Sequence, residues 1–324
     1  MTHFLLTGAG FSRNWGCWVA DEVFEYLLAE PQLSPTMRTQ LWRDRNSQGN
    51  YETTIQALRD AAVTYKGKFE EEYHNFLSIL GGMFTQMRNT YVQSGFQFEK
   101  TTDRQYEITQ FLYQFDAIFT LNQDTLLEHH YFTDFFQGRS EGRWKGWDIP
   151  GVHDLGKPLG NNPYYTATTL KGIDESGFSL RPQHQPYFKL HGSHNWTTKS
   201  GVLLITGGNK ESDIGRVPLL DWNLEQFRKS VCTEHARLMI IGYGFGDRHI
   251  NRILLKAAEV KAKFFIVDVA GIEAMDKRKG QDQIAQRLWD ALSLQIIGAS
   301  RRPLTTTFGA DRIEHAKLQS FFAS

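Results

Sequence analysis

The chain opens with the stretch His3-Phe4-Leu5-Leu6-Thr7-Gly8-Ala9-Gly10-Phe11-Ser12. Its first half, residues 3–7, is short and apolar, which is typical of a buried strand. Two closely spaced glycines follow, and a helical pattern then covers about residues 19–29. A strand that runs into a glycine turn and then a helix is the usual opening of a nucleotide-binding βα unit. We therefore predict an α/β fold with a Rossmann-like sheet.

Strand-like and helical patterns alternate through the later part of the chain. Further strands are predicted at residues 116–121, 186–190, 238–242, 264–269 and 294–298. Helical patterns fit between several of them, at residues 222–235, 248–260 and 281–292. Such alternation favours a mostly parallel sheet with right-handed crossovers and helices on both faces.

Two long segments separate the predicted strands. We expect a single domain over residues 1–324, with a helical insertion at residues 36–115 and an irregular segment at residues 138–186. The first segment carries apolar residues at helical spacing, and a helix is predicted at its end, at about residues 103–115. The second is rich in Gly, Pro, Asn and Trp, and long loops in compact domains are often functional.

The bulk composition excludes several classes of protein. The 324 residues include 36 Lys and Arg against 36 Asp and Glu, so no excess of positive charge indicates a nucleic-acid surface. No apolar run approaches the roughly 20 residues that span a membrane. We see no signal-peptide pattern either, and we expect a soluble, cytoplasmic protein.

Only two cysteines occur, Cys17 and Cys232. They allow one disulfide at most and exclude a four-cysteine zinc site. We therefore expect no structural zinc and no other bound metal.

The first glycine turn is a candidate phosphate site. Glycine lets the chain turn tightly, so that the backbone N–H groups of residues 8–12 can approach a pyrophosphate. The third glycine of the common dinucleotide motif is absent, because Arg13 stands there. A plain strand-to-helix turn is the alternative.

Polar residues follow two of the later predicted strands. Asn122 and Asp124 could hold ribose hydroxyls or an attacking water, although Asp124 could equally cap the helix that follows. His191 could act as a general base, since imidazole titrates near neutral pH; a structural histidine is the alternative.

A second glycine-rich loop covers residues 242–247. Gly242 and Gly244 could approach a phosphate or a sugar, or they could form a turn without a ligand. Asp268, at the end of the next predicted strand, could bind the adenosine ribose or be a surface aspartate. All four segments follow predicted parallel strands, so we expect them to converge on one cleft.

The ordered set of motifs resembles the sirtuin-like superfamily. The matching pieces are Thr7-Gly8-Ala9-Gly10-Phe11-Ser12, Thr120-Leu121-Asn122-Gln123-Asp124, Lys189-Leu190-His191-Gly192-Ser193 and Ile241-Gly242-Tyr243-Gly244-Phe245-Gly246-Asp247. The continuations His191-Gly192-Ser193-His194-Asn195-Trp196 and Asp247-Arg248-His249-Ile250-Asn251 look more like the bacterial sirtuin-like NADases than the protein deacylases. Deacylases of this superfamily usually hold zinc with four cysteines, which this chain lacks.

The resemblance assigns roles to single residues. It implies that Asn122 and His191 are catalytic. Our own hypothesis, apart from the resemblance, is that Asp124 orients the ribose or the attacking water. The resemblance places Gly8, Ala9, Gly10, Phe11 and Ser12 in the pyrophosphate loop, and Gly242 and Gly244 nearer the adenosine. Gly244 stands where many relatives have serine, and Gln123 replaces a commoner tyrosine or isoleucine.

The function implied is hydrolysis of NAD to nicotinamide and ADP-ribose, with cyclic ADP-ribose formed if the adenine folds back. NAD would be the substrate, and no cofactor is expected. Bacterial relatives act in antiphage defence, as homo-oligomers or with a sensor such as an ATPase, a short Argonaute or a nucleotide-processing enzyme. The alternatives are a non-catalytic NAD- or ADP-ribose-sensing module and an ADP-ribosyl or acyl transferase. The joint presence of Asn122 and His191 favours an enzyme.

Overall fold

The computed structural model describes residues 1–47, 49–65, 67, 69–93, 103, 106–136, 141–150, 168–169, 178–198, 201–204, 207, 210–276 and 283–323. All statements on structure concern these residues. None of the helices in this part of the chain is both long and apolar enough to cross a membrane.

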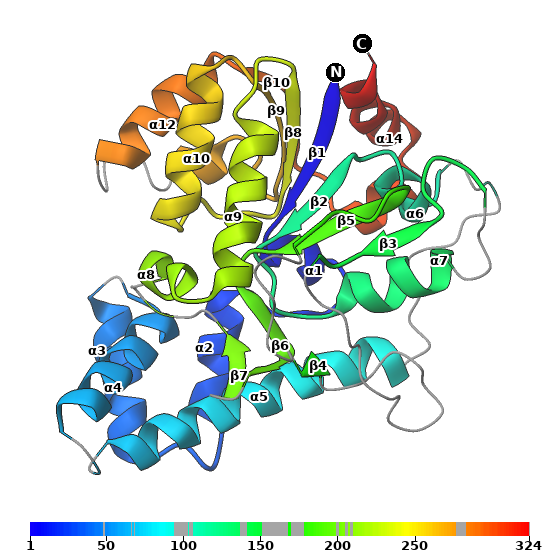
Figure 1. Ribbon diagram of the computed structural model, residues 1–324. Coiled ribbons are helices and arrows are strands. Elements are labelled where there is room, and N and C mark those ends of the chain that lie inside the picture. Colours follow the sequence, from blue (N-terminus) through cyan, green and yellow to red (C-terminus); the bar gives the residue numbers. More distant parts are fainter. Residues whose placement is uncertain are drawn as a thin grey trace.

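A seven-stranded sheet with the order β10-β9-β8-β1-β2-β5-β3 forms the centre of the molecule (Figure 1). Every neighbouring pair in it is parallel. The strands are β1 (Thr2–Thr7), β2 (Ala117–Thr120), β3 (Gly146–Asp148), β5 (His184–Lys189), β8 (Ala236–Ile241), β9 (Lys263–Val267) and β10 (Ile296–Ser300). The predicted α/β fold with a mostly parallel, Rossmann-like sheet is confirmed.

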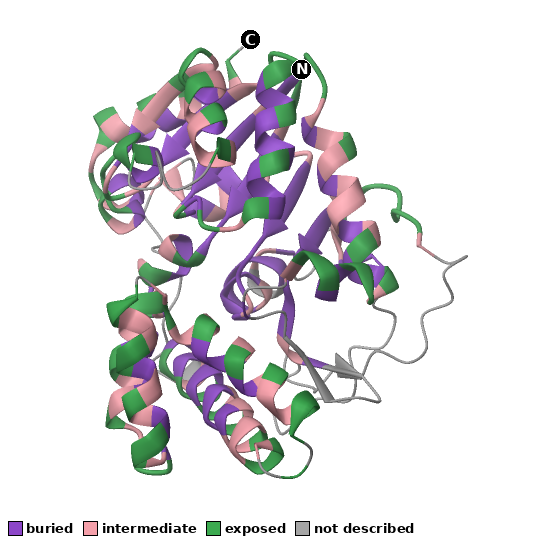
Figure 2. Cartoon of the chain, turned by 90° about the vertical axis from the view of Figure 1, so that its left-hand side faces the viewer, coloured by how far each residue is buried: buried purple, intermediate pink, exposed green. Residues whose placement is uncertain are grey.

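Helices cover both faces of this sheet. Leu6 of β1 packs into one core with Phe227 and Leu254, which come from α9 (Pro218–Val231) and α10 (Arg248–Glu259). Its neighbour Leu5 packs into the other core, with Phe321 near the C-terminus. Since both faces are covered, the strands read as continuous apolar runs. Figure 2 shows these strands as buried ribbons between layers of half-exposed helices.

The remaining helices complete the two layers and a separate helical group. They are α1 (Ala9–Arg13), α2 (Ala20–Ala29), α3 (Pro35–Asn46), α4 (Tyr51–Thr64), α5 (Glu70–Gln93), α6 (Ile108–Leu112), η2 (Glu128–Thr133, a π-helix), α7 (Asp134–Phe136), α8 (Lys210–Gly215), α11 (Glu273–Asp276), α12 (Gln283–Ser293), α13 (Leu304–Gly309), α14 (Arg312–Gln319) and η4 (Ser320–Phe322). Helices α2–α5 lie beyond the edge of the sheet where β1 ends (Figure 1).

Two predicted helices differ from those observed, the first in length and the second in position. The helix expected at residues 103–115 is α6, which covers only Ile108–Leu112; beyond it, the side-chain amide of Gln185 donates to the carbonyl oxygens of Leu112 and Phe115, both at 2.9 Å. Helix α9, expected at residues 222–235, begins at Pro218 and ends at Val231; its early start fits proline, which suits the first helical position.

Most of the predicted irregular segment, residues 138–186, lies outside the described residues. Its described part holds β3 and one strand of a small second sheet, with the order β4-β6-β7. These strands are β4 (Thr168–Thr169), β6 (Gly192–Thr198) and β7 (Gly201–Leu204). The sequence did not predict this sheet, whose strand β6 begins immediately after His191.

Candidate active site

The order of the strands places the candidate residues at one edge of the sheet. Strand β1 lies between β2 and β8, so the chain builds the sheet outward from β1 in both directions. Open parallel sheets bind ligands at the carboxyl ends of strands beside such a reversal. Asn122, His191, Gly242 and Asp268 all follow strands at this carboxyl edge.

The two glycine loops contact each other through their backbones. The N–H of Gly8 donates to the Ile241 carbonyl, and the N–H of Gly10 donates to the Gly242 carbonyl, both at 2.9 Å. A Cβ on Gly242, whose φ is +65°, would lie 2.2 Å from the backbone nitrogen of Phe11. Packing between the loops therefore requires glycine here, whether or not a ligand binds.

Gly244 is in a different environment. Among the described residues, no atom lies within 4 Å of a Cβ added at Gly244. Of the glycines assigned by resemblance, Gly244 is thus better placed for ligand contact than Gly8, Gly10 or Gly242.

The side chains of the first loop face different surroundings. Ala9 is exposed, whereas the ring of Phe11 is wholly buried and packs on Trp15 with 5.2 Å between ring centroids. The ring of Phe11 therefore belongs to the core, and its backbone N–H donates to the Gly8 carbonyl at 2.9 Å. Asn14 is also used by the fold, since its amide donates to the carbonyls of Gly10 and Phe11.

Asn122 is joined to the first glycine loop. Its side-chain Nδ2 donates to Oγ of Ser12 at 3.0 Å, and its backbone N–H donates to Oγ1 of Thr120 at 3.0 Å. Thr120 in turn accepts a 2.8 Å hydrogen bond from Thr7. These bonds connect the ends of β1 and β2 and fix the orientation of the Asn122 amide.

Asp124 has a capping role that the sequence left open. Its Oδ1 accepts a 3.0 Å hydrogen bond from the N–H of Leu126, where the helix begins. Its carbonyl oxygen accepts from Nζ of Lys189, which also pairs with Oε1 of Glu128 at 2.7 Å. Lys189 thereby holds the segment after β2, a role that the sequence analysis did not assign to it.

His191 lies at the end of β5, with 3% of its surface exposed. Its Nε2 atom lies 3.0 Å from Nε2 of His249, at the start of α10. The side-chain amide of Gln123 donates to the His191 carbonyl at 3.2 Å, which links the ends of β2 and β5. Gly192, with φ of +73°, allows the turn from β5 into β6.

Burial sets the charge state of His191. It lowers the pKa of His191 to about 3, although the nearby Asp247 carboxylate opposes the shift. Burial also lowers the pKa of His249, again against Asp247. Both imidazoles are therefore neutral at pH 7, and a neutral imidazole can accept a proton.

Asp247 belongs to a buried ion-pair network. It precedes α10, but its carboxylate makes no helix cap and instead pairs with Nζ of Lys210 at 2.8 Å. Lys210, the first residue of α8, also pairs with Glu52 of α4 at 2.9 Å. Burial raises the pKa of Asp247, but Lys210 and the two histidines together outweigh it and hold that pKa at about 2. Asp247 is thus ionised beside the two histidines.

The loop before α10 is held by its own side chains. The amide of Asn251 donates to the Phe245 carbonyl at 2.9 Å, and its Oδ1 accepts from the Tyr243 hydroxyl at 3.0 Å. The N–H of Asp247 donates to the same hydroxyl at 3.0 Å. Phe245 adopts a left-handed φ of +52°. This loop therefore presents Asp247 and His249 in a fixed arrangement.

His191, Asp247 and His249 also offer metal-ligand atoms within 4.8 Å of one another. Neutral imidazoles and a carboxylate are suitable donors for zinc. However, the ammonium of Lys210 lies 2.8 Å from the carboxylate and would repel a divalent cation. The group therefore fits the handling of a proton better than the binding of a metal.

A comparison with known protein families identifies the family of this chain. The description "SIR2-like domain" matches residues 116–297, more than half of the chain. The chain belongs to the SIR2-like family. Members of this family are typically NAD-dependent enzymes. A search of curated proteins found no match.

The SIR2-like match covers part of the candidate site. It includes Asn122, His191 and Gly244, but it begins after residues 8–12. Strand β1 nevertheless pairs with β2 and β8, which both lie within the match. The first glycine loop thus completes the sheet edge of the SIR2-like domain.

Asp268 adjoins the second glycine loop of the SIR2-like domain. Strand β9, which it follows, pairs with β8, and the N–H of Gly242 donates to the Val267 carbonyl at 2.8 Å. The Oδ1 atom of Asp268 accepts from the N–H of Ala270 at 2.8 Å, and the residue is half-buried. Its role in binding a ribose stays a prediction.

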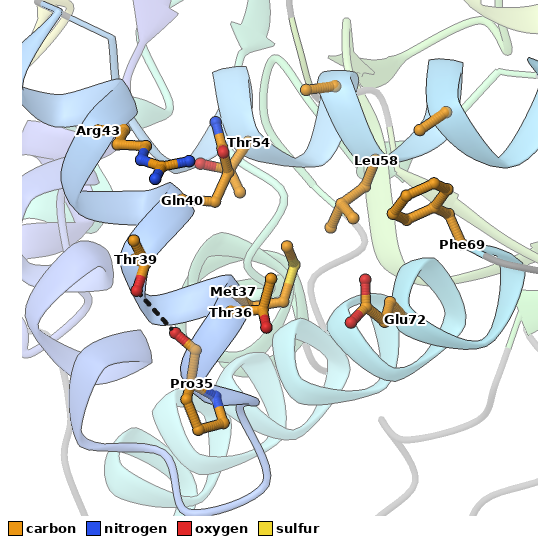
Figure 3. A pocket seen from close by; sticks show the side chains of 12 residues that line it. Pro35, Thr36, Met37, Thr39, Gln40, Arg43, Thr54, Leu58, Phe69 and Glu72 are labelled. Atoms are coloured by element: carbon orange, nitrogen blue, oxygen red, sulfur yellow. Dashed lines mark hydrogen bonds between the residues drawn. The ribbon is translucent and has the colours of Figure 1, made fainter.

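A pocket of about 560 Å³ lies elsewhere, in the helical group formed by α3, α4 and the start of α5 (Figure 3). Its walls include Met37, Leu58, Phe69 and Glu72. None of the residues at the carboxyl edge of the SIR2-like domain lines it.

Proposed function

We propose that the protein hydrolyses NAD to nicotinamide and ADP-ribose. The observation that carries this proposal is the placement of Asn122 and His191 just after the ends of the neighbouring strands β2 and β5, with the Asn122 amide bonded to Ser12 of the glycine loop. Cleavage of NAD needs an amide that orients the substrate, a neutral base that takes a proton, and a loop that binds the phosphates.

The bond that breaks joins ribose C1′ to the nicotinamide nitrogen. Its electron pair leaves with nicotinamide, which departs neutral because it is cationic in NAD, so no general acid is required. Positive charge develops on the ribose ring, as in other glycosidic cleavages. A water oxygen then bonds to C1′ and loses one proton.

Each candidate residue has a part in this reaction. Asn122 orients the ribose or the attacking water, and Asp124 orients one of them. His191 accepts the proton, and the charge of Asp247 stabilises the imidazolium that forms. The backbone of residues 8–12 binds the pyrophosphate, Gly242 and Gly244 adjoin the adenosine side, and Asp268 binds its ribose. The reaction uses no cofactor and no metal.

We further propose a role as the NAD-depleting effector of a bacterial antiphage defence system. The support is the resemblance of residues 191–196 and 247–251 to bacterial sirtuin-like NADases. An unregulated NADase would starve its own cell, so we expect the chain to be activated by homo-oligomerisation or by a sensor partner. Full activity of the isolated monomer at low concentration would contradict this regulation.

Product analysis in ¹⁸O-labelled water tests the proposed reaction. Purified protein, alone and with the product of its neighbouring gene, is incubated with NAD, and mass spectrometry follows every adenosine-containing product. We expect nicotinamide and ADP-ribose carrying one ¹⁸O. Binding of NAD without nicotinamide release would support the sensing module instead. Unlabelled ADP-ribose attached to protein would indicate a transferase.

A further inference from the structure

Two imidazole rings meet at the carboxyl edge of the sheet. The Nε2 atoms of His191 and His249 are 3.0 Å apart, and the two side chains are 3% and 5% exposed. The rings are tilted by 46°, with 5.1 Å between their centroids. A contact of this length between two nitrogens is a hydrogen bond, so one ring carries the hydrogen and the other presents a lone pair.

The charges around this pair are arranged unevenly. Asp247 and Lys210 act on both rings, and Glu211 and Arg252, which pair with each other, act on His249. Glu52 also pairs with Lys210, at 2.9 Å. At neutral pH both rings are uncharged, so the shared hydrogen is the only one between them.

Only one placement of that hydrogen leaves His191 able to act as a base. If His249 donated, Nε2 of His191 would be occupied and its own hydrogen would sit on Nδ1. If His191 donates from Nε2, its Nδ1 carries a free lone pair. Among the described residues, Nδ1 of His191 has no hydrogen-bond partner.

We infer that His249 is a positioning residue, which holds His191 in the tautomer with hydrogen on Nε2 and makes Nδ1 the basic atom. When Nδ1 takes the proton from water or a ribose hydroxyl, the Nε2–H of His191 still donates to Nε2 of His249. The positive charge is then shared between the rings beside the ionised Asp247, until solvent takes the proton. This inference rests on the proposed hydrolysis of NAD.

Nitrogen NMR of histidine-labelled protein tests the tautomer without any reaction. We expect His191 to show a protonated Nε2 and an unprotonated Nδ1 at pH 7, and His249 the reverse. His191→Asn and His249→Gln assign the signals. Protonation of His191 at Nδ1 would overturn the inference, and so would coordination of added Zn²⁺ by both Nε2 atoms at equal stoichiometry.

Kinetics of two variants test the positioning role. His249→Phe keeps a ring but removes the acceptor, and we expect kcat to fall by about 10²-fold with little change in KM for NAD. His249→Gln can still accept from Nε2–H of His191, and it should restore kcat to within about tenfold of the wild type. His315→Phe, at a buried histidine of α14, is the matched control and should leave kcat unchanged.

The two proposals fail in distinguishable ways. If the wild-type protein never released nicotinamide, the proposed function would be wrong, while the NMR experiment would still decide the tautomer. If the wild type cleaved NAD and His249→Phe kept the wild-type kcat, the role of His249 would be wrong and the hydrolase would stand.

Discussion

The side-chain amide of Asn122 donates a hydrogen bond to Oγ of Ser12 across 3.0 Å, although 110 residues separate them in the chain. The bond joins the end of β2 to the glycine loop after β1. It therefore couples the residue proposed to orient the ribose to the loop proposed to hold the pyrophosphate. Their relative placement should affect catalysis more than stability.

Replacement of Ser12 tests this coupling. Ser12→Ala removes the acceptor of the Asn122 amide, which frees its rotation, and we expect kcat to fall about tenfold. The lost hydrogen bond should cost about 1 kcal/mol of stability. Ser300→Ala removes a buried serine hydroxyl at the edge strand β10 and serves as the control. Equal turnover for the two variants would contradict the coupling.

The two glycines of the second loop should respond differently to the same substitution. Gly242→Ala forces a left-handed φ of +65° on alanine and places its Cβ 2.2 Å from a backbone nitrogen. We expect a loss of about 3 kcal/mol or more in the free energy of unfolding. Gly244→Ala has space for its methyl group, so stability should change by less than about 0.5 kcal/mol.

Denaturant titrations of both variants measure these changes, and the KM for NAD of Gly244→Ala tests whether a ligand contacts this glycine. A rise in KM with unchanged stability is the expected result. Unchanged KM would remove Gly244 from the predicted binding site.

Buried histidines should make the free energy of unfolding depend on pH. Burial lowers the pKa of His129 to about 2, of His191 to about 3 and of His194 to about 4. Because an unfolded histidine has a pKa of about 6.5, the unfolded chain binds more protons below that pH. Stability from these groups is complete above pH 6.5 and is lost as the pH falls from 6.5 toward each folded-state pKa.

Calorimetry between pH 7.5 and 5 checks this dependence. The melting temperature should fall steadily below pH 6.5, because each buried histidine lowers the free energy of unfolding by up to about 1.4 kcal/mol per pH unit. His194→Gln should flatten the decline by one such contribution. A melting temperature that stays constant to pH 5 would show that these histidines are not buried in neutral form.

Metal analysis tests the expectation that no zinc is bound. The chain has two cysteines, and Lys210 lies beside the carboxylate of the His191, Asp247 and His249 group. Elemental analysis should therefore find far less than one zinc per chain, and a chelator should leave the melting temperature unchanged. Stoichiometric zinc lost in His249→Phe would identify that group as a metal site.

The fold could be predicted because its strands are covered on both faces and read as apolar runs. The strand predicted at residues 238–242 is observed at Ala236–Ile241, for example. Strands β3 and β6 were not predicted, for two different reasons. Gly146–Asp148 is too short to show a pattern, and the polar run Ser193-His194-Asn195 conceals the start of β6.

The site could be predicted only in part. Asn122 and His191 stood out because each follows a predicted strand within a recognisable motif. No sequence pattern marks Lys210 as a site residue, because only the folding of the chain brings α8 close to Asp247. His249 belongs to the stretch Asp247-Arg248-His249-Ile250-Asn251, and its place two residues after Asp247 is the signal that could have identified it as a site residue.

Asn122 and His191 are the two side chains that we propose carry out the cleavage of NAD. The most direct measurement is nicotinamide release by activated wild type, Asn122→Ala and His191→Ala, with melting temperatures taken on the same preparations. We predict that each variant folds and melts near the wild type and loses about two to four orders of magnitude in turnover. A variant that melts well below the wild type yet keeps full turnover per folded molecule would contradict the account.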